Sequence, residues 1–205
     1  MNDVIVRETG APLPQARGAV IMLHGRGGTA EDILSLTQLF AIPDLAYCAP
    51  QARGGSWYPY SFLAPLEDNE PALSQALGTV AELVARLAGA GLAAERLFLL
   101  GFSQGGCLAL EYAARHARRY GAVIGLSAGL IGPKGTPRNY QGSLAGTPVF
   151  LGCGDNDSHI PLARVQESTR ALAALGAEVT ERIYPGMGHG INEEEIDRVR
   201  AMLAA

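Results

Sequence analysis

One short stretch, residues 96–110, constrains the fold more than any other part of this 205-residue chain. The apolar run 97–100 is typical of a buried strand, and a helix-like pattern follows Gly101-Phe102-Ser103-Gln104-Gly105 at once. A G-x-S-x-G pattern between a strand and a helix predicts a nucleophile elbow, a sharp turn that holds its middle residue at positive φ above the sheet. An ordinary strand-to-helix turn with a small polar residue would give the same five letters, so the elbow needs support from other segments.

Strand-like and helix-like segments alternate along the whole chain. Strands are expected at 4–7, 19–23, 45–49, 97–100, 122–126, 149–153 and 178–184, and helices at about 29–40, 71–88, after Ser103, at 161–175 and from 192 onward. Continuous apolar runs are typical of parallel strands that are buried on both faces. This order predicts a single α/β domain over residues 1–205, with a mostly parallel sheet, helices on both faces and no separate cap domain.

Composition excludes several classes of function. The hydrophobic fraction of 48%, the charged fraction of 18% and the net charge of −4 describe a soluble globular protein without a basic surface for nucleic acid or an anionic membrane. The first 15 residues lack the pattern of a secretory signal, and no apolar run is long enough to span a bilayer, so a cytoplasmic location is expected. The three cysteines are far apart, which indicates neither disulfides nor a metal site.

Four polar residues follow the ends of predicted strands. They are His24, Ser103, Asp157 and His189. In open α/β sheets ligands bind at the carboxyl edge of the strands, and the chain order Ser…Asp…His is the order of α/β hydrolases. The pattern predicts Ser103 as nucleophile, His189 as general base and Asp157 as the acid that orients the imidazole.

Each member of this triad has a competitor or an ordinary structural explanation. Asp155 lies two residues before Asp157 and is the alternative acid, although we prefer Asp157 and expect Asp155 to brace the loop. His159 is the rival base, but it lies too close in sequence to Asp157 to need a separate strand to deliver it. A lone histidine in a glycine-rich loop is often structural, and this is the interpretation we favour for His24.

A tetrahedral intermediate needs two hydrogen-bond donors aimed at its oxygen. One is expected to be the backbone N–H of Gln104, the residue after the nucleophile. The other is expected from the glycine-rich loop 24–28, most simply the backbone N–H of Arg26.

Four motifs together resemble the carboxylesterase/lysophospholipase family that includes the acyl-protein thioesterases. They are LHGRGG at 23–28, GFSQGG at 101–106, GDNDSHIP at 154–161 and YPGMGHG at 184–190. The resemblance covers nearly the whole chain and implies a cofactor-free serine hydrolase with a shallow acyl site, often a homodimer, acting on small-molecule esters. It also implies that Ser103, Asp157 and His189 form the triad, that Arg26 and Gln104 supply the oxyanion donors, and that the aromatic segment with Trp57 and Tyr58 forms a pocket wall.

The chain departs from that family at two places. Cys153 stands where the family commonly has histidine, and Arg26 replaces the usual apolar residue after His-Gly. One hypothesis is that Arg26, or Arg53 in the neighbouring long loop, favours substrates with an anionic group near the ester. The alternative is that both arginines are solvated residues at the rim.

The expected activity is hydrolysis of short- to medium-chain carboxylic esters through an acyl-enzyme. A thioesterase or lysophospholipase acting on longer acyl chains is the close alternative, and a non-catalytic binding protein on a hydrolase scaffold is a more distant one. A nucleotide-binding domain is disfavoured because no G-x-G-x-x-G or P-loop pattern follows a predicted strand. Dienelactone-hydrolase-type chemistry would need cysteine at the position of Ser103, and Cys107 lies beyond the elbow.

Overall fold

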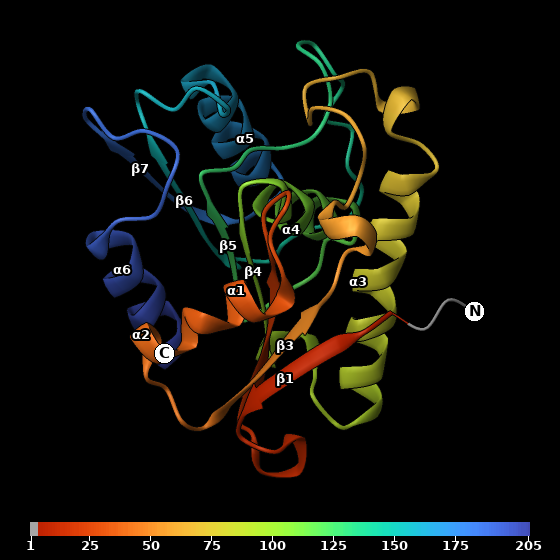
Figure 1. Cartoon of the computed structure of the whole chain (residues 1–205), viewed down its shortest axis with the longest axis vertical. Helices are drawn as coiled ribbons and strands as arrows, with labels where there is room; N and C mark the ends of the chain where they lie inside the picture. The colour runs from red at the N-terminus through yellow and green to blue at the C-terminus, as the bar shows by residue number, and fades with distance from the viewer. Residues whose placement is uncertain (1–3) are drawn as a thin grey trace.

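The computed structural model describes residues 4–205 and contains one seven-stranded sheet (Figure 1). The strand order is β1-β3-β2-β4-β5-β6-β7, in which only the pairing of β1 with β3 is antiparallel. The strands are β1 (Val6–Gly10), β2 (Gly18–Leu23), β3 (Leu45–Pro50), β4 (Leu97–Phe102), β5 (Ala122–Leu126), β6 (Pro148–Gly154) and β7 (Glu178–Tyr184).

Helices cover both faces of this sheet, as the alternating pattern predicts. They are α1 (Ala30–Ser35), α2 (Thr37–Phe40), α3 (Ala72–Gly89), α4 (Gln104–Arg115), α5 (Leu162–Ala174) and α6 (Glu193–Ala204). The helices α3, α4 and α5 pack in one hydrophobic cluster, and α1, α2 and α6 pack in a second cluster. No helix among residues 4–205 is both long enough and apolar enough to cross a membrane.

The central strands are buried on both sides because their successive side chains point to opposite faces. In β2, Ile21 and Leu23 belong to the cluster with α3, α4 and α5, whereas Val20 and Met22 belong to the other cluster. All four side chains are fully buried, and each contributes about 1.5–3 kcal/mol of hydrophobic free energy to folding. The continuous apolar runs of the sequence therefore correspond to a sheet enclosed between two helical layers.

Parallel register brings the carboxyl ends of the strands to one edge. Leu23 at the end of β2 pairs with Gly101, and Phe102 at the end of β4 pairs with Leu126. At the far side of the sheet, Gly154 pairs with Tyr184 at the ends of β6 and β7. The loops that follow these strands consequently emerge side by side.

The expected elements differ from the structure in two details. The first strand begins at Val6 and not at Val4, because its position is set by antiparallel pairing with β3 at an exposed sheet edge and not by apolar burial. The helix expected over 29–40 is divided at Leu36 into α1 and α2. Its predicted capping box is present: the Thr29 side chain accepts from the Asp32 N–H, and the Asp32 side chain accepts from the Thr29 N–H.

Candidate active site

Ser103 occupies the sharp turn between β4 and α4. Its backbone has φ 53° and ψ −120°, a conformation that L-residues rarely adopt outside functional turns. A Cβ atom added to Gly101 would lie 2.3 Å from the backbone of Gly105, and one added to Gly105 would lie 2.1 Å from the Leu23 carbonyl oxygen. Glycine is therefore required where strand and helix nearly touch, and the turn has the geometry of a nucleophile elbow.

Three side chains from separate strand ends form a continuous hydrogen-bonded chain. The Oγ atom of Ser103 lies 2.8 Å from Nε2 of His189, and Nδ1 of His189 lies 2.7 Å from Oδ2 of Asp157. Ser103 follows β4, Asp157 follows β6 and His189 follows β7. Ser103 and His189 line a surface cleft, while the Asp157 side chain is fully buried behind them. This order of residues can pass a proton from the hydroxyl to the imidazole while a carboxylate stabilises the imidazolium.

The environment of Asp157 keeps its carboxyl group ionised. Burial by itself would raise the pKa, but hydrogen bonds from His189 and from the backbone N–H groups of Ile160 and His159 outweigh it. The net result is a pKa below the ordinary value of 3.8. Both backbone N–H groups donate to Oδ1, at 3.0 Å from Ile160 and 2.8 Å from His159, which leaves Oδ2 for His189.

The alternative acid, Asp155, and the rival base, His159, occupy other positions around the site. Asp155 is exposed, and its Oδ1 accepts a 2.7 Å hydrogen bond from the Gly186 N–H, so it braces the loop that carries His189. The His159 ring lies edge-on to His189 with the ring centroids 4.7 Å apart, at the mouth of the cleft. The remaining histidine of the chain, His116, lies at the end of α4, where it stacks on Tyr112, and it does not line the cleft.

His24 supports the loop between β2 and α1. It is buried, its Nδ1 lies 2.7 Å from the Gly25 carbonyl oxygen, and its Nε2 accepts a 3.1 Å hydrogen bond from the Ala52 N–H. These partners assign a neutral imidazole with its proton on Nδ1. The ring therefore connects two loops and does not face the cleft.

The aromatic segment differs in part from the expectation. Trp57 is buried, its ring centroid lies 5.0 Å from that of His24 with the ring planes tilted, and its Nε1 donates to the His24 carbonyl oxygen at 2.8 Å. Trp57 does not line the cleft, so the expectation that it forms a pocket wall needs correction. Its indole N–H is bonded to the His24 carbonyl oxygen and its ring packs against His24 beneath the surface. Tyr58 does line the cleft.

The glycine-rich loop after β2 lies directly against Ser103. A Cβ added to Gly25 would contact Cβ of Ser103 at 3.5 Å. Gly27 donates to the Gly55 carbonyl oxygen at 2.7 Å, and Gly28 donates to the Gly25 carbonyl oxygen at 3.1 Å. Within residues 4–205 the backbone N–H of Arg26, between them in this turn, and that of Gln104, at the start of α4, donate to no protein acceptor. These are the two donors that the sequence predicts for an oxyanion.

The cleft beside Ser103 has a volume of about 610 Å³. Its walls combine aromatic and apolar side chains, among them Tyr58, Phe62, Phe102 and Ile160, with polar side chains. Cys107 also reaches the lining, but burial raises the pKa of its thiol to about 12, so the group is not a thiolate at neutral pH. The Ser103 hydroxyl, hydrogen-bonded to His189, is therefore a better candidate nucleophile than the Cys107 thiol.

Arg26 also lines the cleft, whereas Arg53 does not. The Arg26 guanidinium donates to Ser56 Oγ at 3.0 Å and to the carbonyl oxygens of Pro59 and Tyr60 at 2.9 and 2.6 Å. Its polar contacts in the structure are thus to the long loop after β3.

Two buried groups at the end of β6 were not singled out as site residues from the sequence. The Cys153 thiol donates toward Asp157 Oδ2 across 3.6 Å. Glu195, in the first turn of α6, is fully buried, and its Oε1 has no hydrogen-bond partner among the described residues. Cys153 could have been found from its place at the end of β6, but Glu195 follows the pattern of an ordinary capping residue.

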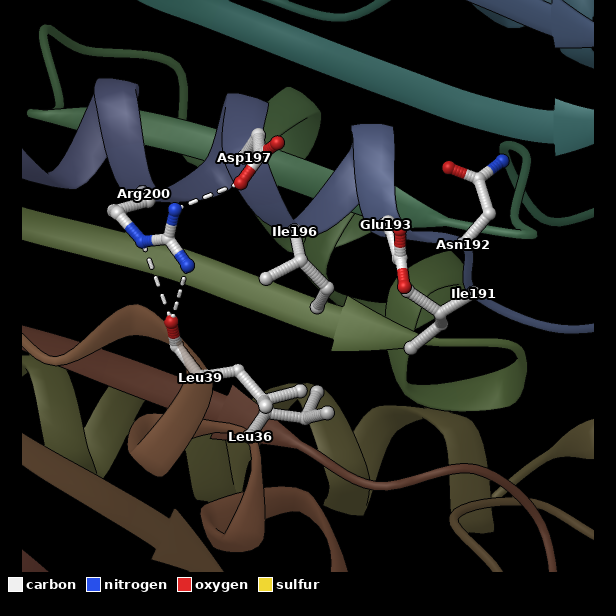
Figure 2. A pocket seen from close by; sticks show the side chains of 8 residues that line it. All are labelled: Leu36, Leu39, Ile191, Asn192, Glu193, Ile196, Asp197 and Arg200. Carbon is white, nitrogen blue, oxygen red and sulfur yellow. Dashed lines mark hydrogen bonds and ion pairs between the residues drawn. The ribbon is translucent and has the colours of Figure 1, made fainter.

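A second cavity, of about 390 Å³, lies between α2 and α6 (Figure 2). Leu36, Leu39, Ile191 and Ile196 give it an apolar floor, and Arg200 closes one end by donating to the Leu39 carbonyl oxygen at 2.7 Å. Its lining contains no histidine, serine or cysteine, so it offers no nucleophile. Residues 4–205 also hold no cluster of three or more histidine, cysteine, aspartate or glutamate side chains that could bind a metal ion.

The fold and the elbow together define an α/β hydrolase. A family model described as Phospholipase/Carboxylesterase matches residues 6–205. The chain therefore belongs to the phospholipase/carboxylesterase family of α/β hydrolases.

A solved relative agrees with this assignment over nearly the whole length. A phospholipase/carboxylesterase from Dyadobacter fermentans is 45% identical, with a TM-score of 0.95, and the match covers 99% of this chain and 97% of that one. Esterase PE8 is 26% identical with a TM-score of 0.77, and the match covers 98% of each chain.

Curated relatives match more partially. Acyl-protein thioesterase 1 of Gibberella zeae is 37% identical over 55% of this chain and 49% of the relative. Putative esterase NocK of Nocardia uniformis is 30% identical over 82% of this chain and 48% of the relative. The chain thus spans about half the length of these two curated relatives.

Proposed function

We propose that this protein is a serine hydrolase that cleaves carboxylic esters of small molecules with short- to medium-chain acyl groups. The single observation that carries the proposal is the hydrogen-bonded chain Ser103–His189–Asp157, with distances of 2.8 and 2.7 Å, at the wall of an open cleft. The names of the relatives, esterases and an acyl-protein thioesterase, support the same chemistry. We also propose that residues 1–205 work as a single domain without a cofactor, and that the protein forms a homodimer.

The reaction would proceed in two steps. Ser103 Oγ attacks the ester carbonyl carbon while His189 Nε2 takes the hydroxyl proton, and the carbonyl oxygen becomes an oxyanion that accepts from the N–H groups of Arg26 and Gln104. The intermediate then expels the alcohol, which takes the proton from His189, and leaves an acyl group on Ser103. Water, deprotonated by His189, attacks the acyl-enzyme, and the proton returns to Ser103 as the carboxylic acid leaves.

A thioesterase or lysophospholipase that acts on longer acyl chains is the second candidate. The open cleft and its apolar lining with Phe62, Phe102 and Ile160 favour it, because such a surface would bury the methylenes of an extended chain at about 0.8 kcal/mol each. Both candidates use the same triad, and they differ in the acyl length for which kcat/KM is highest.

The test compares wild type with Ser103→Ala on p-nitrophenyl acetate, butyrate, octanoate and palmitate. Ser35→Ala is the matched control, because Ser35 is exposed on α1 and does not line the cleft. We expect Ser103→Ala to lose at least about 10⁴-fold in kcat and Ser35→Ala to retain wild-type rates. Equal rates in wild type and Ser103→Ala would contradict the proposal and favour a binding protein on this scaffold.

A further inference from the structure

The two expected oxyanion donors belong to segments that do not follow one another in the chain. The N–H of Arg26 lies in the loop after β2, and the N–H of Gln104 begins α4 after the elbow. Both must be aimed at one substrate oxygen, and each such donor is worth about 10²–10³ in kcat. The two segments therefore need a physical connection besides the sheet.

The side chain of Gln104 binds one part of the loop after β3. Its Oε1 accepts from the Trp57 N–H at 3.0 Å, and its Nε2 donates to the Tyr58 carbonyl oxygen at 2.8 Å. The side chain is buried, so these hydrogen bonds are shielded from water. Its amide therefore holds the loop on both sides of Trp57.

The side chain of Arg26 binds the same short segment. Its Nη1 donates to Ser56 Oγ and to the Pro59 carbonyl oxygen, and its Nη2 donates to the Tyr60 carbonyl oxygen. The ring of Tyr58 lies 6.0 Å from the guanidinium carbon, within the range of a cation–π contact. The planar fork of arginine can reach three acceptors at once, which an ammonium group on a lysine cannot match in geometry.

Ser56 contacts both the Arg26 side chain and the Gln104 side chain. Its Oγ accepts from Arg26 Nη1 and lies 3.3 Å from Gln104 Nε2, and it donates to the Tyr58 carbonyl oxygen at 2.8 Å. The far end of the segment is fixed independently, because the buried side chain of Asn69 accepts from the Tyr60 N–H at 2.8 Å.

We propose that residues 56–60 form a bridging segment that couples the two oxyanion donors, and that Arg26 is a positioning residue for acyl transfer. Its guanidinium acts on protein acceptors and not on an anionic group of the substrate. This inference rests on the proposed function, since it assumes that Arg26 and Gln104 supply the donors. It replaces the hypothesis that Arg26 selects anionic esters.

The first test compares Arg26→Met, Arg26→Lys and the matched control Arg53→Met. Arg53 is exposed in the loop after β3, which also contains the bridging segment, and it does not line the cleft. The substrates are p-nitrophenyl butyrate, which is neutral, and p-nitrophenyl hemisuccinate, which is anionic. We expect Arg26→Met to lower kcat about 10- to 100-fold on both substrates with KM changed less than about threefold, because the donors lose their alignment. Arg26→Lys should recover part of the loss, and Arg53→Met should match wild type.

The second test is a double-mutant cycle between Arg26→Met and Gln104→Ala, a variant that keeps the backbone N–H. Because both side chains hold one segment, the double variant should lose less than the product of the two single losses. Ser56→Ala should lower kcat several-fold and remove most of this coupling. Ser56→Ala is also the variant to use if Arg26→Met does not fold, since it removes a single oxygen atom.

Three outcomes would overturn the inference. They are a rise in KM confined to the anionic ester, a wild-type kcat in Arg26→Met, and strictly multiplicative losses in the cycle. The rate at which a fluorophosphonate labels Ser103 separates this failure from failure of the proposed function. If the fluorophosphonate labels wild type and Arg26→Met equally fast, only the inference about the bridging segment is contradicted. If it does not label wild type, the proposed function is contradicted.

Discussion

The Cys153 thiol and the Nδ1 atom of His189 share one acceptor, the Oδ2 atom of Asp157, at 3.6 and 2.7 Å. Burial, and then the negative charge of Asp157, raises the pKa of Cys153 to about 12. At neutral pH the group is therefore a thiol that donates a weak hydrogen bond to the carboxylate. Cys153 thus belongs to the surroundings that set how strongly Asp157 binds the imidazole.

Replacing Cys153 by alanine should lower kcat on p-nitrophenyl butyrate by less than about threefold. Without the S–H donor, Oδ2 of Asp157 is held by one hydrogen bond fewer, but a thiol is a weak donor and Asp157 keeps its hydrogen bonds from His189, His159 and Ile160. Cys153→Ser keeps a donor and should return kcat to the wild-type value, and identical kcat values in all three proteins would contradict this role.

Asp157→Asn and Asp155→Asn should separate the two candidate acids. In Asp157→Asn the amide oxygen stays with the N–H groups of His159 and Ile160, so the NH2 group takes the place of Oδ2 and donates to Nδ1 of His189. The imidazole then carries its proton on Nε2, facing Ser103, and kcat should fall about 10⁴-fold. Asp155→Asn weakens one hydrogen bond to the Gly186 N–H and should cost on the order of 1 kcal/mol of stability with less than a tenfold loss in kcat. Steady-state kinetics and thermal unfolding of both variants measure this, and a larger kcat loss in Asp155→Asn would reverse the assignment.

His159→Ala should distinguish a neighbour of the base from the base itself. The His159 ring packs edge-on against His189, while its backbone N–H, which alanine retains, supports Asp157. We therefore expect kcat to change less than about fivefold in His159→Ala and to fall at least about 10⁴-fold in His189→Ala. A comparable loss in the two variants, measured on p-nitrophenyl butyrate, would make His159 the base.

Glu195 should make the stability of the protein depend on pH. Burial raises the pKa of Glu195. The hydrogen bond from the Asn192 N–H lowers this pKa, the negative charge of Glu194 raises it further, and the net result is a pKa raised from 4.5 to about 7. The carboxyl group is also close to Gly152, where an added Cβ would lie 2.1 Å from Oε1. The folded protein therefore binds this proton more tightly than the unfolded chain, and stability falls as the pH rises from about 4.5 to about 7.

The measurement is denaturant unfolding of wild type, Glu195→Gln and Glu193→Gln at several pH values between 4.5 and 8. Relative to Glu195→Gln, wild type should lose on the order of 2–3 kcal/mol across this range, because an amide cannot ionise. Glu193 is exposed in the same helical turn and serves as the control, which should parallel wild type. Parallel curves for all three proteins would show that Glu195 is not the titrating group.

Much of the fold and the order of the candidate triad could be predicted from local patterns. Apolar runs predict buried strands, and parallel strands deliver their following residues to one edge, so Ser103, Asp157 and His189 could be placed together without coordinates. The elbow was equally predictable, because Gly101 and Gly105 flank a serine between a strand and a helix. These are short-range features, in which residues close in the chain determine the local geometry.

Other properties depend on contacts between distant segments. The burial of Trp57 against His24, the three acceptors of Arg26 and the position of Cys153 beside Asp157 follow from how loops pack at the sheet edge. The amino-acid sequence by itself determined which chemical groups reach that edge, because strand order and turn geometry are encoded locally. Only the tertiary structure decided which partner each group finds there, because a hydrogen bond depends on positions within a few tenths of an ångström that the whole packed domain determines.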